Sequence, residues 1–237
     1  MSIKGLLFDK DGTLLDYYGT WMGVNRALAV RLAGEDEAAI EALMVRGGLE
    51  PGTGRIRAGT PLAAGTARQI AECLAPDLRG AEFETLVEDY QRIFTEGARK
   101  AAVAVEGLKE TLEALAAGGY RLGIATTDSE QGVQASLGSF EVLGLFDFIS
   151  GCDSGHGVKP DPGIVLAFCA AVGLEPAQVG VIGDNGHDLT MGRAAGAGQR
   201  LGASSSVMLG AGDRPPDPAP PGAGTKDPGP PRRPAIV

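Results

Sequence analysis

The chain has 237 residues, 43% of them hydrophobic, and a formal net charge of -9. This length and composition suffice for a large packed core, and the acidic balance argues against nucleic acid or an anionic membrane as the main partner. Three cysteines without a C-x-x-C spacing indicate neither disulfides nor a zinc site, and no signal peptide or bilayer-spanning run is recognisable, so we expect a cytoplasmic protein.

The first predicted element is a short buried strand at residues 3–8, and a turn at Gly12 follows it. Residues 16–99 show no alternating strand pattern, and their apolar residues recur at helical spacing instead. We therefore expect helices near residues 21–32, 35–45, 61–74 and 81–94. Together they predict a helical insertion after the first strand.

Strands and helices alternate in the rest of the chain. Strands are expected at residues 120–126, 146–150 and 179–182, and helices around residues 108–115, 129–137 and 164–172. Strands separated by helices form βαβ units, so the sequence predicts an α/β fold with a doubly wound parallel sheet whose strands all end at one edge. The predicted division is a core of residues 1–15 and 100–210, a helical insertion of residues 16–99, and a proline-rich, disordered tail of residues 211–237.

Polar residues stand at the ends of the predicted strands. In chain order they are Asp9, Asp11, Thr13, Thr126, Lys159, Asp184 and Asp188. Ligands bind at the carboxyl edge of open α/β sheets, so we expect these residues to share one site. Several carboxylates in one site repel one another, and a bound cation would relieve the repulsion. Mg²⁺ fits such oxygen donors, whereas zinc is disfavoured because no His or Cys cluster accompanies the acids.

The residue types predict phosphoryl chemistry. Asp9 can act as a nucleophile on phosphorus and form an aspartyl-phosphate. Asp11, two residues on, points to the same side of an extended strand end, where it could protonate the leaving oxygen and later deprotonate water. Thr126 and Lys159 would stabilise the equatorial oxygens of the phosphoryl group.

These residues resemble the four motifs of the haloacid dehalogenase superfamily. The motifs are Asp9-Lys10-Asp11-Gly12-Thr13, the strand that ends in Thr126, Lys159-Pro160-Asp161-Pro162, and Gly183-Asp184-x-x-x-Asp188, in order and at suitable separations over residues 3–200. The resemblance implies a doubly wound sheet with a helical cap inserted after the first strand. It also implies Mg²⁺ held by Asp9, Asp184 and the backbone carbonyl of Asp11, with Thr13 and Asp188 in supporting positions. Phosphoglycolate phosphatases and their relatives are the most similar branch.

The sequence departs from the family pattern in two places. Thr127 stands where the phosphatase branch commonly has Asn, which affects a contact that fixes the backbone. The family usually continues past the fourth motif with an apolar strand, and residues 205–209 are the segment expected to form it here.

Several residues near the motifs admit a plainer interpretation. Arg55 and Arg57 lie in a Gly-rich loop that could hold a substrate carboxylate, although a solvated loop is favoured. Trp21 could line the pocket, but packing of the insertion is the default expectation. His187 is expected to be structural, and Asn185 could serve the metal site or equally cap the following helix.

The sequence therefore predicts a Mg²⁺-dependent phosphatase that acts on a small phosphorylated metabolite, with phosphoglycolate as the first candidate, in a monomer or homodimer. Dehalogenation is disfavoured because it needs neither a metal nor Asp11. Phosphonatase chemistry needs a cap lysine, and no lysine occurs between Lys10 and Lys100. A sugar-phosphate phosphomutase and a phosphoacceptor or binding module without turnover remain as alternatives.

Overall fold

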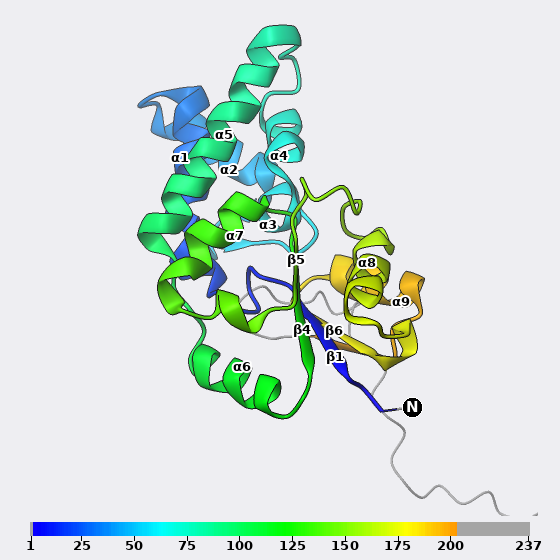
Figure 1. Ribbon diagram of the computed structural model, residues 1–237. Coiled ribbons are helices and arrows are strands. Elements are labelled where there is room, and N and C mark those ends of the chain that lie inside the picture. Colours follow the sequence, from blue (N-terminus) through cyan, green and yellow to red (C-terminus); the bar gives the residue numbers. More distant parts are fainter. Residues whose placement is uncertain (1, 203–237) are drawn as a thin grey trace, which may run out of the picture.

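The computed structural model describes residues 2–202, which form a parallel sheet flanked by helices and a helical insertion beyond one edge of the sheet (Figure 1). The strands of the main sheet are β1 (Gly5–Phe8), β4 (Arg121–Ala125), β5 (Phe148–Ser150), β6 (Val179–Gly183) and β7 (Gln199–Gly202). The flanking helices are α6 (Leu108–Ala117), α7 (Glu130–Leu137), α8 (Gly163–Val172) and α9 (Gly186–Ala195), with short 3₁₀ turns at Gly138–Phe140, Leu143–Leu145 and Pro176–Gln178. The predicted α/β fold with a doubly wound parallel sheet is confirmed.

The order of the strands is β5-β4-β1-β6-β7, with every pair parallel. Strand β1 is central, and its last residue, Phe8, stands opposite Ile124 of β4 and Ile182 of β6. The three strands therefore end at the same level. Residues that follow them in the chain are brought to one edge of the sheet.

The two faces of the sheet bury alternate residues, as the period of a strand requires. Leu7 packs with Phe168 of α8 and with Met191 of α9 on one face. Phe8 packs on the opposite face, in the cluster that contains Leu112 of α6 and Val133 of α7. Helices cover both faces, so the central strands β1 and β6 have apolar sequences.

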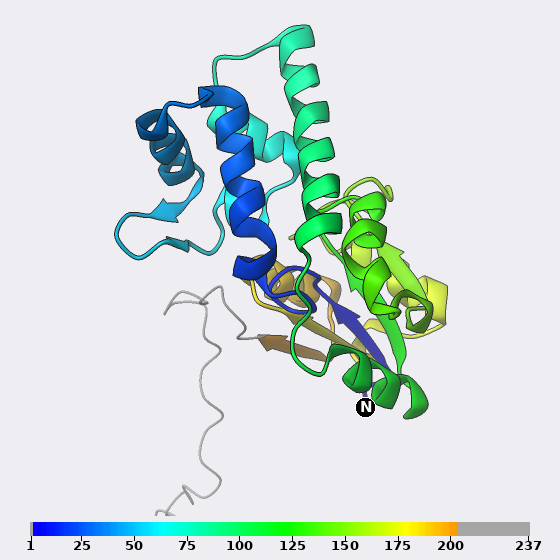
Figure 2. The same ribbon diagram turned by 90° about the vertical axis from the view of Figure 1, so that its left-hand side faces the viewer.

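The insertion lies above the carboxyl edge of the sheet (Figure 2). Its helices are α1 (Tyr17–Ala33), α2 (Glu37–Gly47), α3 (Pro61–Ala64), α4 (Ala67–Leu74) and α5 (Gly80–Ala101), and the short strands β2 (Leu49–Glu50) and β3 (Arg55–Ile56) pair as a hairpin. These elements have a hydrophobic cluster of their own, in which Leu28, Ile70 and Tyr90 are fully buried. Helix α5 also packs against α7, so the insertion rests on the core. The boundaries at residues 16 and 99 stay a prediction.

One local prediction was wrong, and two further features were missed. The expected helix at residues 61–74 is broken, because Gly65 ends α3 and Thr66 caps α4 by accepting a hydrogen bond from Gln69 N. The β2–β3 hairpin was missed because each strand has only two residues, too few for a periodic pattern. Strand β7 was missed because all four of its residues are exposed, as on an edge strand, and it carries no apolar run. Residues 205–209 and the predicted tail at 211–237 lie outside the described residues.

None of the helices within residues 2–202 combines the length and the apolar character needed to cross a lipid bilayer.

Candidate active site

The predicted nucleophile and the predicted lysine are in direct contact. Asp9 follows β1, and its backbone N–H donates to Ile182 O at 2.7 Å, which anchors it beside β6. Lys159 Nζ lies 2.5 Å from Asp9 Oδ1 and 2.6 Å from Asp188 Oδ1. Lys159 is buried, and while burial alone would lower its pKa, Asp188 and Asp9 raise it. The lysine is therefore a fixed cation between two carboxylates.

Three carboxylates form a candidate metal site. Oxygen atoms of Asp9, Asp184 and Asp188 all lie within 4.8 Å of one another. Burial raises the pKa of Asp9 to about 6, although Lys159 opposes the shift. Burial and the charges of Asp9 and Asp188 raise the pKa of Asp184 to about 8. Burial is the main cause of both shifts and neighbouring carboxylates add to it, so a divalent cation bound by oxygen atoms would favour the charged carboxylates.

Two glycines allow the acids to approach so closely. Gly12 has φ +88°, and a Cβ built there would stand 1.9 Å from Asp184 Oδ2. A Cβ on Gly183 would stand 2.2 Å from Asp188 Oδ2. A side chain at either position would displace a carboxylate from the cluster.

The two predicted threonines differ in their surroundings. Thr126 is buried, and its Oγ1 accepts a hydrogen bond from Asp128 N at 3.1 Å. Thr127, the next residue, lines the cavity. Thr13 Oγ1 is buried without a hydrogen-bond partner in the described part of the chain. The roles of Thr126 and Thr13 toward a phosphoryl group stay predictions.

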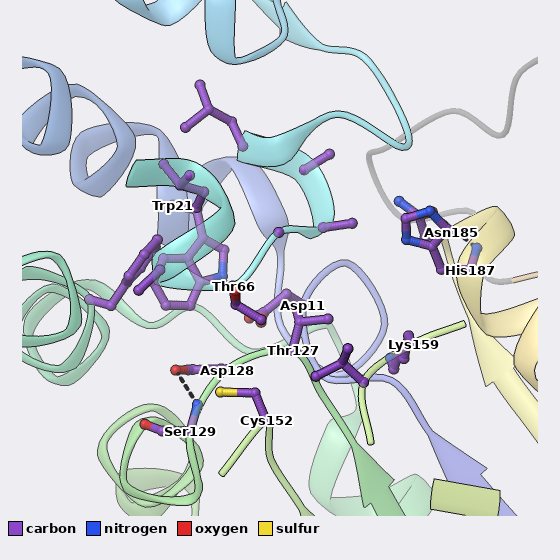
Figure 3. Close-up of a pocket in the computed structure, with 18 of the residues that line it drawn as sticks. Asp11, Trp21, Thr66, Thr127, Asp128, Ser129, Cys152, Lys159, Asn185 and His187 are labelled. Atoms are coloured by element: carbon purple, nitrogen blue, oxygen red, sulfur yellow. Dashed lines mark hydrogen bonds between the residues drawn. The ribbon is translucent and has the colours of Figure 1, made fainter. Parts of the chain in front are cut away.

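A cavity of about 380 Å³ opens above these residues (Figure 3). Asp9, Lys159 and Asp184 line its floor at the edge of the sheet. Side chains of the insertion line the upper part, and the large apolar ones include Trp21, Leu62, Ile70, Val87 and Phe94. The site is thus shared between the core and the insertion.

Three residues surround or support Asp11, and two of them, Lys10 and Asp128, were missed by the sequence analysis as site residues. Trp21 Nε1 donates to Asp11 Oδ1 at 2.6 Å, so Trp21 does more than pack the insertion. Lys10 is fully buried, and its Nζ lies 2.8 Å from the same Oδ1 and 3.1 Å from Asp128 Oδ2. No spacing in the sequence signals these contacts, because Lys10 is the variable position inside the first motif and Asp128 lies two residues after Thr126.

The structure also shows where the other residues considered in the sequence analysis lie. Asn185 caps α9, since its side chain accepts from His187 N at 3.2 Å. Burial, followed by the charge of Lys159, lowers the pKa of His187. Arg55 and Arg57 are exposed and do not line the cavity, which agrees with a solvated loop.

Comparison with known proteins places this geometry in a family. The family model of haloacid dehalogenase-like hydrolases matches residues 3–196. A phosphoglycolate phosphatase of Nitrosospira multiformis is 27% identical over 201 residues, 83% of this chain and 82% of the relative. An N-acetylmuramic acid 6-phosphate phosphatase of Pseudomonas putida is 24% identical over 196 residues, 83% of this chain and 81% of the relative.

A solved structure shares the fold. The crystal structure of a predicted phosphoglycolate phosphatase from Haemophilus somnus superimposes with a TM-score of 0.70 at 23% identity, covering 91% of this chain and 92% of the other. The family model spans most of the chain, including all the strands from β1 to β6 and their acids. The chain belongs to the haloacid dehalogenase-like hydrolases.

Proposed function

We propose that this protein is a Mg²⁺-dependent phosphatase that hydrolyses a small phosphomonoester through an aspartyl-phosphate on Asp9. One observation carries the proposal: Asp9, Lys159, Asp184 and Asp188 form one buried charge cluster on the floor of the 380 Å³ cavity. The cluster combines a nucleophile, a fixed cation and a candidate metal site. The family and the names of the relatives support phosphoryl transfer.

The carboxylate cluster fits Mg²⁺. Its donors are all oxygen atoms, and three carboxylates with oxygens within 4.8 Å of one another bring several negative charges to one point. Asp9, Asp184 and the carbonyl of Asp11 would hold the ion, with Asp188 in support. Bound Mg²⁺ would neutralise charge on the phosphoryl oxygens.

The side chains of the chain itself then perform the reaction. An Asp9 oxygen bonds to phosphorus while the bond from phosphorus to the leaving oxygen breaks, and Asp11 gives its proton to that oxygen. Asp11, now a carboxylate, takes a proton from water as the water oxygen bonds to phosphorus and Asp9 is released. Lys159 and Thr126 hold the equatorial oxygens, and Asp188 keeps Lys159 in place through its 2.6 Å ion pair.

The residues that line the cavity indicate which substrates it would bind. Lys159 and Arg68 are the lysine and arginine side chains that line the described cavity, and both are ion-paired within the chain. Arg68 Nη2 lies 2.6 Å from Glu84 Oε2 at the surface, where such pairs contribute little stability and exchange readily. Arg68 can therefore leave Glu84 and pair with a substrate carboxylate, so phosphoglycolate remains the first candidate substrate. The aromatic and aliphatic upper wall also suits a ring-sized leaving group such as that of benzyl phosphate.

Replacement of the nucleophile tests the proposal. Asp9→Asn should abolish hydrolysis of p-nitrophenyl phosphate with Mg²⁺, while thermal unfolding shows a folded protein. Retained turnover would rule out Asp9 as the nucleophile. A screen of phosphoglycolate, benzyl phosphate, sugar phosphates and nucleoside monophosphates, ranked by kcat/KM, would then test the substrate.

The same assays separate the alternatives. A phosphomutase would transfer phosphate to a sugar hydroxyl with little release of inorganic phosphate. A phosphoacceptor would release at most one equivalent of leaving group per enzyme. Many turnovers with release of inorganic phosphate exclude both.

A further inference from the structure

Asp11 is held at one oxygen by two donors from different parts of the fold. Trp21 Nε1 lies 2.6 Å from Asp11 Oδ1, and Lys10 Nζ lies 2.8 Å from the same atom. Trp21 belongs to α1 of the insertion, whereas Lys10 precedes Asp11 in the core. Both donors make their hydrogen bond to Oδ1, and neither makes one to Oδ2. Figure 3 shows the indole and Asp11 on the same side of the cavity.

Lys10 is a fully buried cation that needs compensating charge. Asp128, directly after the second motif, supplies it through a contact of 3.1 Å between Oδ2 and Lys10 Nζ. The ammonium group also lies 4.8 Å from the centroid of the Trp21 ring, within the range of a cation–π interaction. Lys10 is thus fixed from three sides, by Asp11, Asp128 and Trp21.

Neighbouring residues hold the side chain of Asp128 in place. Its Oδ1 accepts from Ser129 N at 2.7 Å, and its backbone N–H donates to Thr126 Oγ1. Gly132 on α7 makes room for the carboxylate, since a Cβ there would stand 2.2 Å from both of its oxygens. A surface acid would need no such accommodation.

Trp21 is also held in place. Its ring meets the ring of Phe94 on α5 edge to face, with 5.4 Å between centroids. The donor that reaches Asp11 therefore comes from the packed interior of the insertion. The hydrogen bond connects that packing to the acid that moves the proton.

We propose that Lys10, Trp21 and Asp128 are positioning residues for Asp11: Trp21 and Lys10 fix Oδ1, Asp128 balances Lys10, and Oδ2 is thereby directed at the leaving oxygen. This rests on the proposed function. In the first step the proton of Asp11 passes from Oδ2 to the leaving oxygen as the bond from that oxygen to phosphorus breaks. In the second step the same Oδ2 takes a proton from water. Oδ1 accepts hydrogen bonds whether Asp11 is protonated or ionised, and it does not itself carry the transferred proton.

The test uses two substrates that share a ring and differ in their need for an acid. The leaving group of benzyl phosphate is a poor alkoxide and needs a proton from the enzyme. The leaving group of p-nitrophenyl phosphate is a stabilised phenolate and does not need one. The value of kcat/KM reports the steps up to release of the alcohol or phenol, which is the first product. Trp21→Phe keeps an aromatic ring and removes the N–H. We expect the ratio of kcat/KM for p-nitrophenyl phosphate to that for benzyl phosphate to rise about tenfold or more, because Asp11 loses a donor that orients it and proton transfer matters only for benzyl phosphate.

A second variant provides the test if Trp21→Phe does not fold. Lys10→Met combined with Asp128→Asn removes both buried charges together, so neither is left unpaired, and the same rise in the ratio is expected. Tyr90→Phe is the matched control, because it removes a buried hydrogen bond to Leu28 O within the insertion while Tyr90 neither lines the cavity nor contacts Asp11, and it should leave the ratio unchanged. Phosphoglycolate replaces benzyl phosphate if it is the better alkyl substrate.

A uniform loss on both substrates, or an unchanged ratio in the folded variants, would overturn the positioning role. Loss of all activity in Asp9→Asn together with an unchanged ratio in Trp21→Phe would overturn this inference alone. Retained activity in Asp9→Asn would instead overturn the proposed function on which it rests.

Discussion

Gly12 and Asp184 lie so close that a Cβ on Gly12 would stand 1.9 Å from Asp184 Oδ2. Gly12 also has φ +88°, a conformation that side chains other than hydrogen disfavour. The turn after β1 therefore leaves room for Asp184, the acid that follows β6. This contact between distant motifs depends on the absence of a side chain.

Gly12→Ala should therefore damage the metal site beyond its cost in backbone strain. We expect kcat/KM to fall at least 100-fold and Mg²⁺ affinity to weaken, as measured by phosphatase assay and calorimetric titration. Gly119→Ala is the matched control, since Gly119 has φ +82° but nothing lies within 4 Å of its Cβ position. Each substitution should cost about 1–2 kcal/mol of stability through strain. Equal activity in the two variants would contradict the role of Gly12.

Lys159→Met should make the thermal stability of the protein depend on a bound metal ion. Lys159 is the cation that contacts Asp9 and Asp188, so its removal leaves the carboxylate cluster without a positive charge from the chain. We expect the Tm without metal to fall at pH 7.5 and to recover on addition of Mg²⁺, while activity stays lost. Lys109→Met, which removes an exposed ion pair with Glu141, is the control and should change neither property. A Tm insensitive to Mg²⁺ would argue against metal binding at the cluster.

Stabilisation by Mg²⁺ should increase with pH. Burial raises the pKa of Asp9 to about 6 and that of Asp184 to about 8, from 3.8, so the metal-free folded state holds protons that the unfolded chain has lost. For carboxyls shifted in this direction, stability is greatest below pH 4 and is lost as pH rises toward 8. A cation binds better once those protons leave, so it offsets the loss. The rise in Tm caused by Mg²⁺ should be larger at pH 8.5 than at pH 5.5.

Differential scanning fluorimetry at the two pH values measures this difference. Asp184→Asn removes the carboxyl with the higher pKa and should flatten the dependence of the Tm rise on pH. Equal shifts at both pH values in the unaltered protein would contradict the prediction.

Trp21 offers a direct optical signal, because it is the only tryptophan in the chain. Its indole N–H donates to Asp11, so Asp11→Leu, which removes the acceptor, should change the wavelength and intensity of its emission. Asp16→Ala is the control, since Asp16 caps α1 through Gly19 N at 2.6 Å but does not contact the indole. Identical spectra for Asp11→Leu and the unaltered protein would show that the hydrogen bond is absent in solution.

The order of the elements around the motifs could be predicted from the sequence. Apolar runs long enough to show a pattern, such as the one that ends at Phe8, became the strands of the core. Where the pattern was short or polar the prediction failed, as in the edge strand β7, which buries none of its residues. The break between α3 and α4 was missed because a cap at Thr66 is a local hydrogen bond that periodicity does not register.

The sequence by itself determined which acids share an edge, because parallel strands joined by right-handed crossovers bring Asp9 and Asp184 to the same side. Only the tertiary structure decided what surrounds them. The contact of Trp21 with Asp11 depends on how the insertion packs over the sheet, and that of Lys10 with Asp128 joins residues 118 positions apart in the chain. Spacing along a chain carries no information on such contacts, since they follow from packing between elements and not from the period of any one of them.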